Sequence, residues 1–259
     1  MEIVSYGDVK FLKSEKLDGV LHGFSLRFGG VSKGEFDSLN VGLRRGDNPF
    51  KSIRNIEICT DALNMEKKNL TLTYQLHTNN VEFVTGDDIG KGFIREWGKG
   101  VDGIVTDAVN VPLMCYSADC VPILFYEPQR GLIGAVHSGW RGTKDNIAKA
   151  AVSLMKEKGG NKEKIRAFIG PAIGMCCYEV SKAVADEFSD YLDCIEAKSE
   201  EKFMLDLKSI VKTQLLNIGV REENIDLCPM CTACENDLFF SHRKQQGKSG
   251  LLGGFIQMI

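Results

Sequence analysis

Two apolar runs in the middle of the chain determine its hydrophobic pattern. The run VPILFYE (121–127) and the run LIGAVH (132–137) lie on either side of the tetrapeptide Pro-Gln-Arg-Gly. Segments rich in β-branched and aromatic residues that flank a Pro/Gly turn are typical of a β-hairpin. The pattern therefore predicts two antiparallel strands joined by a tight turn.

The predicted register places two reactive side chains on one face of the hairpin. If Glu127 pairs with Leu132, then Pro122 lies opposite His137. Cys120 precedes Pro122 by two positions, so its side chain points to the same face as that of His137. Diagonal neighbours across such a pair lie roughly 7–8 Å apart at Cα, which is within reach of a shared metal ion or a shared proton.

A glycine-flanked turn and a helix are predicted after His137. The turn SGWRGT (138–143) leads into a helical pattern over 143–158, for which Thr143 is the predicted N-cap. The apolar positions with helical spacing are Ile147, Ala150, Ala151 and Leu154. Free backbone N–H groups at a helix start attract anions, and Arg141 in the turn can clamp a phosphate or a carboxylate.

The rest of the chain predicts short strands, turns and helices that are interleaved. The predicted elements are a helix over 53–63 capped by Ser52, β-structure over 69–84 with His77 in mid-run, a strand at 165–170, and helices over 181–190 and 205–218. No low-complexity linker or change of composition divides the chain. Residues 1–259 are therefore predicted to form one mixed α/β domain.

Composition and charge narrow the class of protein. With 259 residues, 43% of them hydrophobic and 26% charged, the chain can bury a sizeable core. A net charge of −3 and a pI near 5.9 argue against a nucleic-acid-binding surface, because the two largest basic clusters, Arg44-Arg45 and Arg243-Lys244, are only pairs. No run approaches the roughly 18 apolar residues of a membrane helix, and the first residues lack the apolar core of a secretory signal. We expect a cytoplasmic protein.

Cys120 and His137 admit two chemical interpretations. With a third donor, a thiolate and imidazole form a tetrahedral zinc site with one open position. Without a third donor, His137 can lower the pKa of the Cys120 thiol and produce a nucleophile for acyl transfer. His77 is the candidate third donor among the four histidines of the chain. Either Asp102 or Asp107 can orient a ligand histidine.

The other cysteines and the arginines give weaker signals. Nine cysteines in a reducing compartment are expected to be free thiols. The run CPMCTAC (228–234) has Cys-x-x-Cys spacing without a second such pair, so reduced thiols are predicted there rather than a metal site. Neighbours on a strand face opposite sides, so Cys176 and Cys177 are predicted to serve packing. The basic residues predicted to line a pocket for an anionic substrate are Arg44, Arg141 and Arg243.

Several blocks of the sequence resemble those of the laccase-domain family and occur in the same order. They are QLHTNNV, VDGIVTD, SADCVPILFYEP, GAVHSGWRGT, IGPAIGMCCYEV, LDL and FFSHRKQQGKSG, and the likeness extends from residue 25 to the C-terminus. Members of this family are labelled polyphenol oxidase, peptidoglycan editing factor and purine nucleoside phosphorylase. The resemblance implies an α+β fold with mixed sheets in four layers, α/β/β/α. It also implies a zinc ion (Zn²⁺) held by His77, Cys120 and His137.

The activity implied by the resemblance is phosphorolysis of adenosine, inosine and methylthioadenosine, together with deamination of adenosine. The implied partners are a small nucleoside and phosphate, with no nucleic acid and no membrane. The predicted catalytic residues are Cys120, His137 and Arg141, and the predicted substrate-binding residues are Arg44, Thr143 and Arg243.

Three other functions remain open from the sequence. A Cys–His hydrolase that edits peptidoglycan precursors would use Cys120 as its nucleophile, and a zinc-stabilised binding protein would turn over no nucleoside. A copper polyphenol oxidase would need histidines for several copper ions, and four in all are too few. Two residues depart from the family tail and bear on substrate preference: Leu251 replaces a common arginine, and His242 replaces a common tyrosine.

Overall fold

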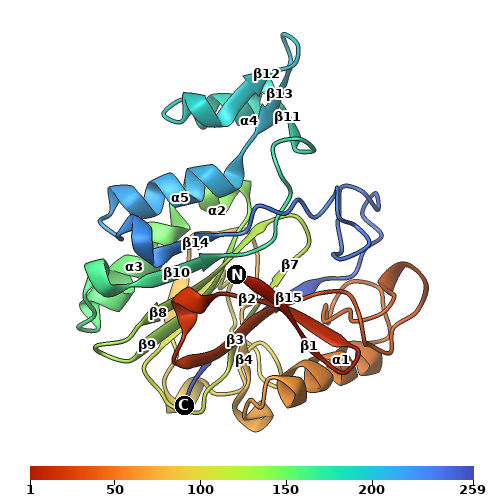
Figure 1. Cartoon of the computed structure of the whole chain (residues 1–259), viewed down its shortest axis with the longest axis vertical. Helices are drawn as coiled ribbons and strands as arrows, with labels where there is room; N and C mark the ends of the chain where they lie inside the picture. Colours follow the sequence, from red (N-terminus) through yellow and green to blue (C-terminus); the bar gives the residue numbers. More distant parts are fainter.

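The structure, a computed structural model, describes all residues from 1 to 259. Two six-stranded sheets pack face to face, and helices cover the outer face of each (Figure 1). A third, three-stranded sheet projects from one end of the molecule. The α+β class and the four-layer arrangement predicted by the resemblance are confirmed.

The first sheet joins the two ends of the chain. Its strand order is β1-β2-β3-β15-β7-β4, and all neighbours are antiparallel except β4 and β7. The strands are β1 (Glu2–Tyr6), β2 (Val9–Lys13), β3 (Val20–Ser25), β15 (Leu252–Met258), β7 (Leu113–Ser117) and β4 (Thr71–Leu72). The C-terminal strand β15 therefore lies between an N-terminal strand and a central one.

The second sheet contains the predicted hairpin at its centre. Its order is β14-β10-β8-β9-β6-β5, and the strands are β14 (Ile225–Leu227), β10 (Arg166–Ile169), β8 (Val121–Glu127), β9 (Leu132–Ser138), β6 (Gly103–Thr106) and β5 (Val81–Phe83). Within the hairpin Glu127 pairs with Leu132 and Pro122 pairs with His137. The predicted register is confirmed.

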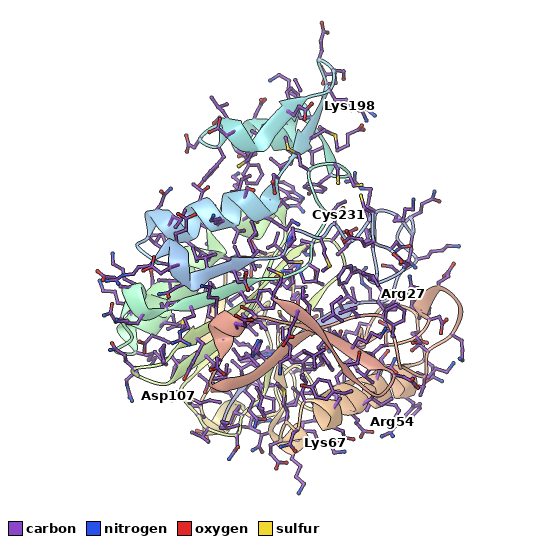
Figure 2. The ribbon with its side chains drawn as sticks, viewed as in Figure 1. Arg27, Arg54, Lys67, Asp107, Lys198 and Cys231 are labelled. Carbon is purple, nitrogen blue, oxygen red and sulfur yellow. The ribbon has the colours of Figure 1, made fainter.

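The projecting sheet is formed by residues that follow β10 in the chain and precede β14. It consists of β11 (Glu179–Ser181), β13 (Lys202–Leu205) and β12 (Ile195–Ala197), with the short helix α4 (Lys182–Asp186) beside it. Figure 2 shows Lys198 at the tip of this projection and Cys231 at its base. The remaining helices are α1 (Pro49–Ala62), α2 (Trp140–Lys144), α3 (Ile147–Glu157) and α5 (Leu207–Asn217). None of them combines the length and the apolar character that crossing a membrane requires.

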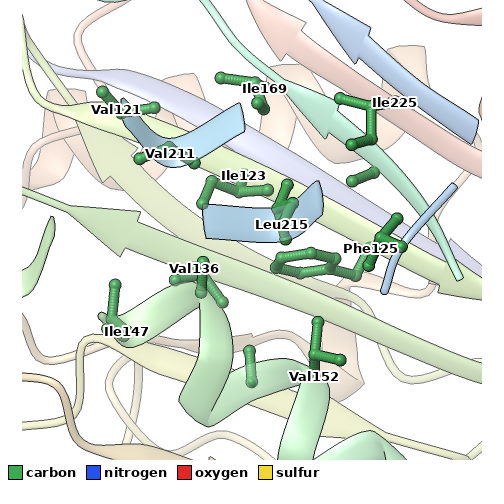
Figure 3. Packing of buried hydrophobic residues seen from close by; sticks show 14 of the residues in the cluster. Val121, Ile123, Phe125, Val136, Ile147, Val152, Ile169, Val211, Leu215 and Ile225 are labelled. Atoms are coloured by element: carbon green, nitrogen blue, oxygen red, sulfur yellow. The ribbon is translucent and has the colours of Figure 1, made fainter. Parts of the chain in front are cut away.

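Alternating side chains of the hairpin contribute to two separate cores. Ile123 and Phe125 of β8 point to α3 and α5 and belong to a cluster of 24 buried residues (Figure 3). Leu124, between them, points to the first sheet and packs with Phe24 and Phe168. Because both faces of this strand are buried, its hydrophobic run is continuous rather than alternating.

Two of the predicted helix caps are wrong. The first helix begins at Pro49, and the side chain of Asn48 caps it by accepting from Phe50 N. Ser52 is buried inside that helix and donates to the carbonyl of Gly42 at 3.0 Å. A proline at the first helical turn sets the helix start one turn earlier than the apolar pattern indicates.

The helix predicted over 143–158 is divided in two. Helix α2 ends at Lys144, and α3 is capped by Asn146, which adopts a left-handed conformation and accepts from Lys149 N. Thr143 is therefore not a cap but lies within α2. Its hydroxyl is buried and hydrogen-bonded to Ser138 Oγ at 2.7 Å.

The β-structure predicted over 69–84 is reduced to its two ends. Only β4 and β5 form there, and His77 lies in the loop between them with a positive φ of 60°. The loop leaves the strand conformation because its backbone N–H groups bind a buried carboxylate. That carboxylate also defines the candidate site.

Candidate metal centre

Three separate segments bring two imidazoles and a thiol together. The ligand atoms of His77, Cys120 and His137 all lie within 4.8 Å of one another. The two imidazole rings are 4.9 Å apart and perpendicular, and Cys120 Sγ lies 4.0 Å from His77 Nε2. His77 is exposed, Cys120 is half-buried and His137 is buried, so the cluster can be reached from the side of His77.

Asp102 holds both histidine segments in place. Its fully buried carboxylate accepts hydrogen bonds from the backbone N–H groups of Leu76, His77 and Thr78, and from the Thr78 hydroxyl. The same carboxylate accepts from His137 Nδ1 at 2.9 Å. With Nδ1 committed to Asp102, the Nε2 atom of His137 is free to bind a ligand on the side of the cluster.

The sequence indicates that either of two aspartates can orient a ligand histidine, and the structure assigns this contact to one of them. Asp102 contacts His137 directly, whereas Asp107 lies at the surface and pairs with Arg130 at 3.6 Å. A carboxylate bonded to the far nitrogen of a ligand histidine is the usual support of a protein metal site.

The turn that carries Cys120 is fixed from behind by Asp119. The Asp119 carboxylate accepts from Thr232 Oγ1 and from Arg243 N, each at 2.6 Å. Its backbone carbonyl accepts from Ile173 N at 2.9 Å. Asp119 has a φ of 88°, a strained value for a residue with a side chain, and these three bonds stabilise it.

Gly139 is a site residue that the sequence pattern did not single out. A Cβ atom at this position would lie 2.7 Å from the His77 ring and 3.3 Å from Cys120 Sγ. Only glycine therefore lets the chain after His137 approach the cluster this closely. The signal in the sequence was the Ser-Gly-Trp turn, which predicted a helix start instead.

Charge interactions within the cluster oppose the effect of burial. Burial alone would raise the pKa of Cys120, but the charge and hydrogen bond of His137, aided by His77, lower it to about 6. Burial would likewise lower the pKa of His137, but the Cys120 thiolate and Asp102 raise it to about 9. Without a metal, the neutral-pH form of this pair is therefore a thiolate beside an imidazolium.

The residues fit a single zinc ion. Tetrahedral coordination with nitrogen and sulfur ligands separates the ligand atoms by about 3.3–3.8 Å, and the three donor atoms here lie within 4.8 Å of one another. Three protein ligands that include a thiolate and two imidazoles leave one position for substrate or water. The carboxylate support of His137 is the second feature expected of such a site.

We expect zinc affinity at this centre to depend steeply on pH. Between about pH 6 and pH 9 the ion must displace the proton of His137, so the association constant should rise about tenfold per pH unit and level off above pH 9. Below about pH 6 the thiol proton must leave as well, and the slope should steepen. Zinc titrations in chelator buffers measure this affinity, and the difference between the wild type and a His77→Ala variant is the contribution of this centre. A flat profile between pH 6 and 9 would contradict the assignment.

The cluster opens into a pocket of about 320 Å³, which is within the range of small-molecule sites. Its lining includes apolar and aromatic side chains, two arginines and all three members of the cluster. Outside the cluster, the lining residues include Leu43, Arg44, Arg45, Tyr74, Tyr116 and Leu251. The Arg44 guanidinium lies 4.7 Å over the ring of Tyr74. Arg44 and Arg45 are exposed, and neither pairs with a carboxylate.

A second, smaller pocket of about 210 Å³ lies on the other side of Cys120. It is lined by Tyr178, His242 and Arg243, among others, and shares Ala118 and Cys120 with the first pocket. The Arg243 guanidinium already donates to the backbone carbonyl of Glu179 at 3.0 Å. Cys120 therefore lies at the boundary between two pockets that are lined by different residues.

The three arginines predicted to share one pocket do not do so. Arg44 lines the first pocket and Arg243 the second, while Arg141 lines neither and lies over its neighbour Trp140 at 4.3 Å. Thr143 is buried, so its hydroxyl offers nothing to a substrate. The sequence predicts an anion site at Arg141 and Thr143 because its pattern indicates one long helix over 143–158, and that helix is broken after Lys144.

A comparison with known families assigns the chain to one of them. A family model described as multi-copper polyphenol oxidoreductase laccase matches residues 21–259. The chain belongs to this family. The match includes every residue of the candidate centre, because His77, Cys120 and His137 all lie within it.

Several proteins are similar to this chain over nearly their whole length. Purine nucleoside phosphorylase YlmD of Bacillus subtilis is 39% identical over 249 residues, which cover 92% of this chain and 88% of the relative. The crystal structure of YlmD from Geobacillus stearothermophilus superimposes with a TM-score of 0.92 at 34% identity, covering 98% of this chain and 97% of the other. The Bacillus licheniformis hypothetical protein YfiH also gives a TM-score of 0.92 at 34% identity, with 97% of both chains covered.

The two departures from the family tail both lie at the pockets. Leu251 lines the first pocket and His242 lines the second. Both side chains therefore lie where a substrate in these pockets can contact them. The histidines outside the cluster are dispersed, because His22 is buried against Ser14 N while His242 lies in the second pocket.

Proposed function

We propose that this protein is a zinc-dependent purine nucleoside phosphorylase. It would convert adenosine, inosine or S-methyl-5′-thioadenosine and phosphate into the free base and the corresponding pentose 1-phosphate. It would also convert adenosine and water into inosine and ammonia. The observation that carries the proposal is the three-ligand centre at one end of a 320 Å³ pocket with Arg44 and Arg45 at its rim. The names of the relatives, at 30–39% identity over nearly the whole chain, support it.

The first pocket has the two kinds of surface that the substrates need. Leu43, Tyr116 and Leu251 offer apolar area for a purine and its sugar. Arg44 and Arg45 offer cationic donors for the phosphate, and because they have no carboxylate partner they need not break an ion pair to bind it. Both substrates would thus meet beside the cluster.

In the proposed mechanism the protein positions reactants around the metal centre. Zinc held by His77, Cys120 and His137 would supply Lewis-acid polarisation of a substrate atom or of a water molecule. Arg44 orients the phosphate so that one of its oxygens forms the new bond to the anomeric carbon as the bond to the base breaks. Asp102 retains the proton on His137 Nδ1 and keeps the ring aligned. Cys120 acts as a ligand and not as the attacking atom.

Replacing Arg44 with alanine tests the phosphate assignment. We expect the KM for phosphate to rise about 10- to 100-fold, because a charge-assisted hydrogen bond contributes about 1.5–3 kcal/mol, while the KM for adenosine changes little. Arg54→Ala is the matched control, since Arg54 is exposed and pairs with Glu57 on the surface of α1. Initial rates across phosphate and adenosine concentrations provide both constants. An unchanged phosphate KM would refute this placement.

A Cys–His hydrolase is the second candidate, and one observation favours it. The lowered pKa of Cys120 beside His137, with Asp102 behind the imidazole, is also the arrangement of an activated thiol nucleophile. The two candidates differ in what metal removal does. A nucleophilic Cys120 would work without the ion, and a ligand Cys120 would not.

A further inference from the structure

A second group of thiols gathers away from the centre described above. The sulfur atoms of Cys176, Cys177, Cys231 and Cys234 all lie within 4.8 Å of one another. Cys234 Sγ lies 3.5 Å from Cys176 Sγ and 3.4 Å from Cys177 Sγ. The two pairs come from loops that are nearly 60 residues apart, since Cys176 and Cys234 are separated by 58 positions.

The backbone explains why neighbouring cysteines can face one point. Cys177 N and Tyr178 N both donate to the carbonyl of Gly174, so Cys176 and Cys177 lie in a turn and not on a strand. The sequence prediction that the two side chains face opposite sides assumes an extended backbone, and the turn contradicts that assumption. The second loop is held alongside by a bridge between Ala172 and Cys231.

We propose that these four cysteines bind one structural zinc ion. A tetrahedral site with four zinc–sulfur bonds of about 2.3 Å has sulfur atoms about 3.8 Å apart. Here all four sulfur atoms lie within 4.8 Å of one another, and two of the pairs are 3.5 and 3.4 Å apart. Four thiolates without an open position are the ligand set of a structural zinc site. A four-iron cluster would hold the sulfur atoms further apart, because its iron and sulfide atoms lie between them.

The surroundings of the cluster suit a bound thiolate. Gly174 N donates to Cys231 Sγ at 3.1 Å, and such backbone donors stabilise a sulfur ligand. Cys231 is buried, while Cys176 and Cys234 are exposed, so an ion can enter from solvent and finish in a partly enclosed site.

The position of the cluster indicates what the ion would stabilise. Cys231 lies at the base of the projecting sheet (Figure 2), where the local hydrophobic cluster contains only Ile173, Cys231 and Ala233 as buried members. A structural metal at this point would add stability to that small local cluster. The ion would also fix Thr232, whose hydroxyl holds Asp119 next to Cys120.

Metal counting tests this inference independently of any enzyme activity. Protein purified under reducing conditions should contain about two zinc equivalents per chain. Cys176→Ser and Cys234→Ser should each lose the zinc ion of the four-cysteine site and keep the ion at the first centre. His77→Ala should lose the ion at the first centre and keep the other. Cys194→Ser changes a cysteine outside both clusters and should keep both ions. Elemental analysis that finds one equivalent or fewer in the wild type, unchanged by Cys234→Ser, would overturn the proposal, and so would iron in place of zinc.

The wild type alone provides a second test if a variant fails to fold. Cobalt loaded into the chelator-treated protein should give the intense thiolate-to-metal absorption of a four-sulfur site. In the zinc form, Cys176 and Cys234 should resist alkylation despite their exposure and react once a chelator is added. Immediate alkylation of both, or an intact mass two units low from a disulfide in the reduced preparation, would contradict the inference.

Discussion

Replacing Asp102 with asparagine is expected to lower the free energy of unfolding by about 3–5 kcal/mol and to weaken zinc binding at the first centre about 10- to 100-fold. The carboxylate is fully buried and accepts from Leu76, His77 and Thr78 of the loop, and from His137 Nδ1. An asparagine amide would point N–H groups at N–H donors. Both histidines would then lose their common support.

Denaturant unfolding and zinc titration of the same variant measure the two effects. Asp107→Asn is the matched control, because Asp107 is the nearby aspartate whose only ion pair, with Arg130, is at the surface. We expect that control to change stability by less than about 1 kcal/mol. A variant at Asp102 with wild-type stability and wild-type zinc affinity would show that the carboxylate does not organise the site.

Replacing Cys120 with serine is expected to remove the ion from the first centre and to lower kcat/KM for adenosine phosphorolysis about a thousandfold or more, which corresponds to about 4 kcal/mol of transition-state stabilisation. A serine hydroxyl stays protonated where the cysteine is already a thiolate, since the pKa of Cys120 is about 6. The fold should persist, because Cys120 is only half-buried. Cys194→Ser serves again as the control.

The two proposed roles of Cys120 make opposite predictions for this variant. If Cys120 is a ligand, zinc content at the first centre and turnover fall together, and adding excess zinc restores part of both. If Cys120 is a nucleophile, turnover of the variant falls whether or not zinc is bound at the first centre. Elemental analysis and initial rates on one preparation distinguish the two outcomes.

Local sequence patterns predicted the elements that local interactions determine. The central hairpin, its register and the shared face of Cys120 and His137 follow from two apolar runs and a turn, and the structure has all three. The helix α5 was predicted over 205–218 and lies within that range. In each case residues close together in the sequence carry the information.

The features that sequence patterns missed depend on contacts between distant segments. The sequence pattern predicts β-structure around His77, yet the His77 loop turns to bind the carboxylate of Asp102, which lies 25 residues further along the chain. The cysteine pairs meet only because two loops far apart in sequence lie side by side. Likewise, Arg44 and Arg243 resemble each other in sequence context, but the fold places them in different pockets. No single window of residues contains such information.

Return of activity with metal is the most direct test of the central claim. Protein stripped of zinc by a chelator should cleave adenosine in the presence of phosphate at less than about one hundredth of the original rate, and activity should return as zinc refills the His77–Cys120–His137 centre. The His77→Ala variant should not recover under the same titration. A stripped protein, shown by elemental analysis to contain no metal, that retains full phosphate-dependent cleavage would contradict the account.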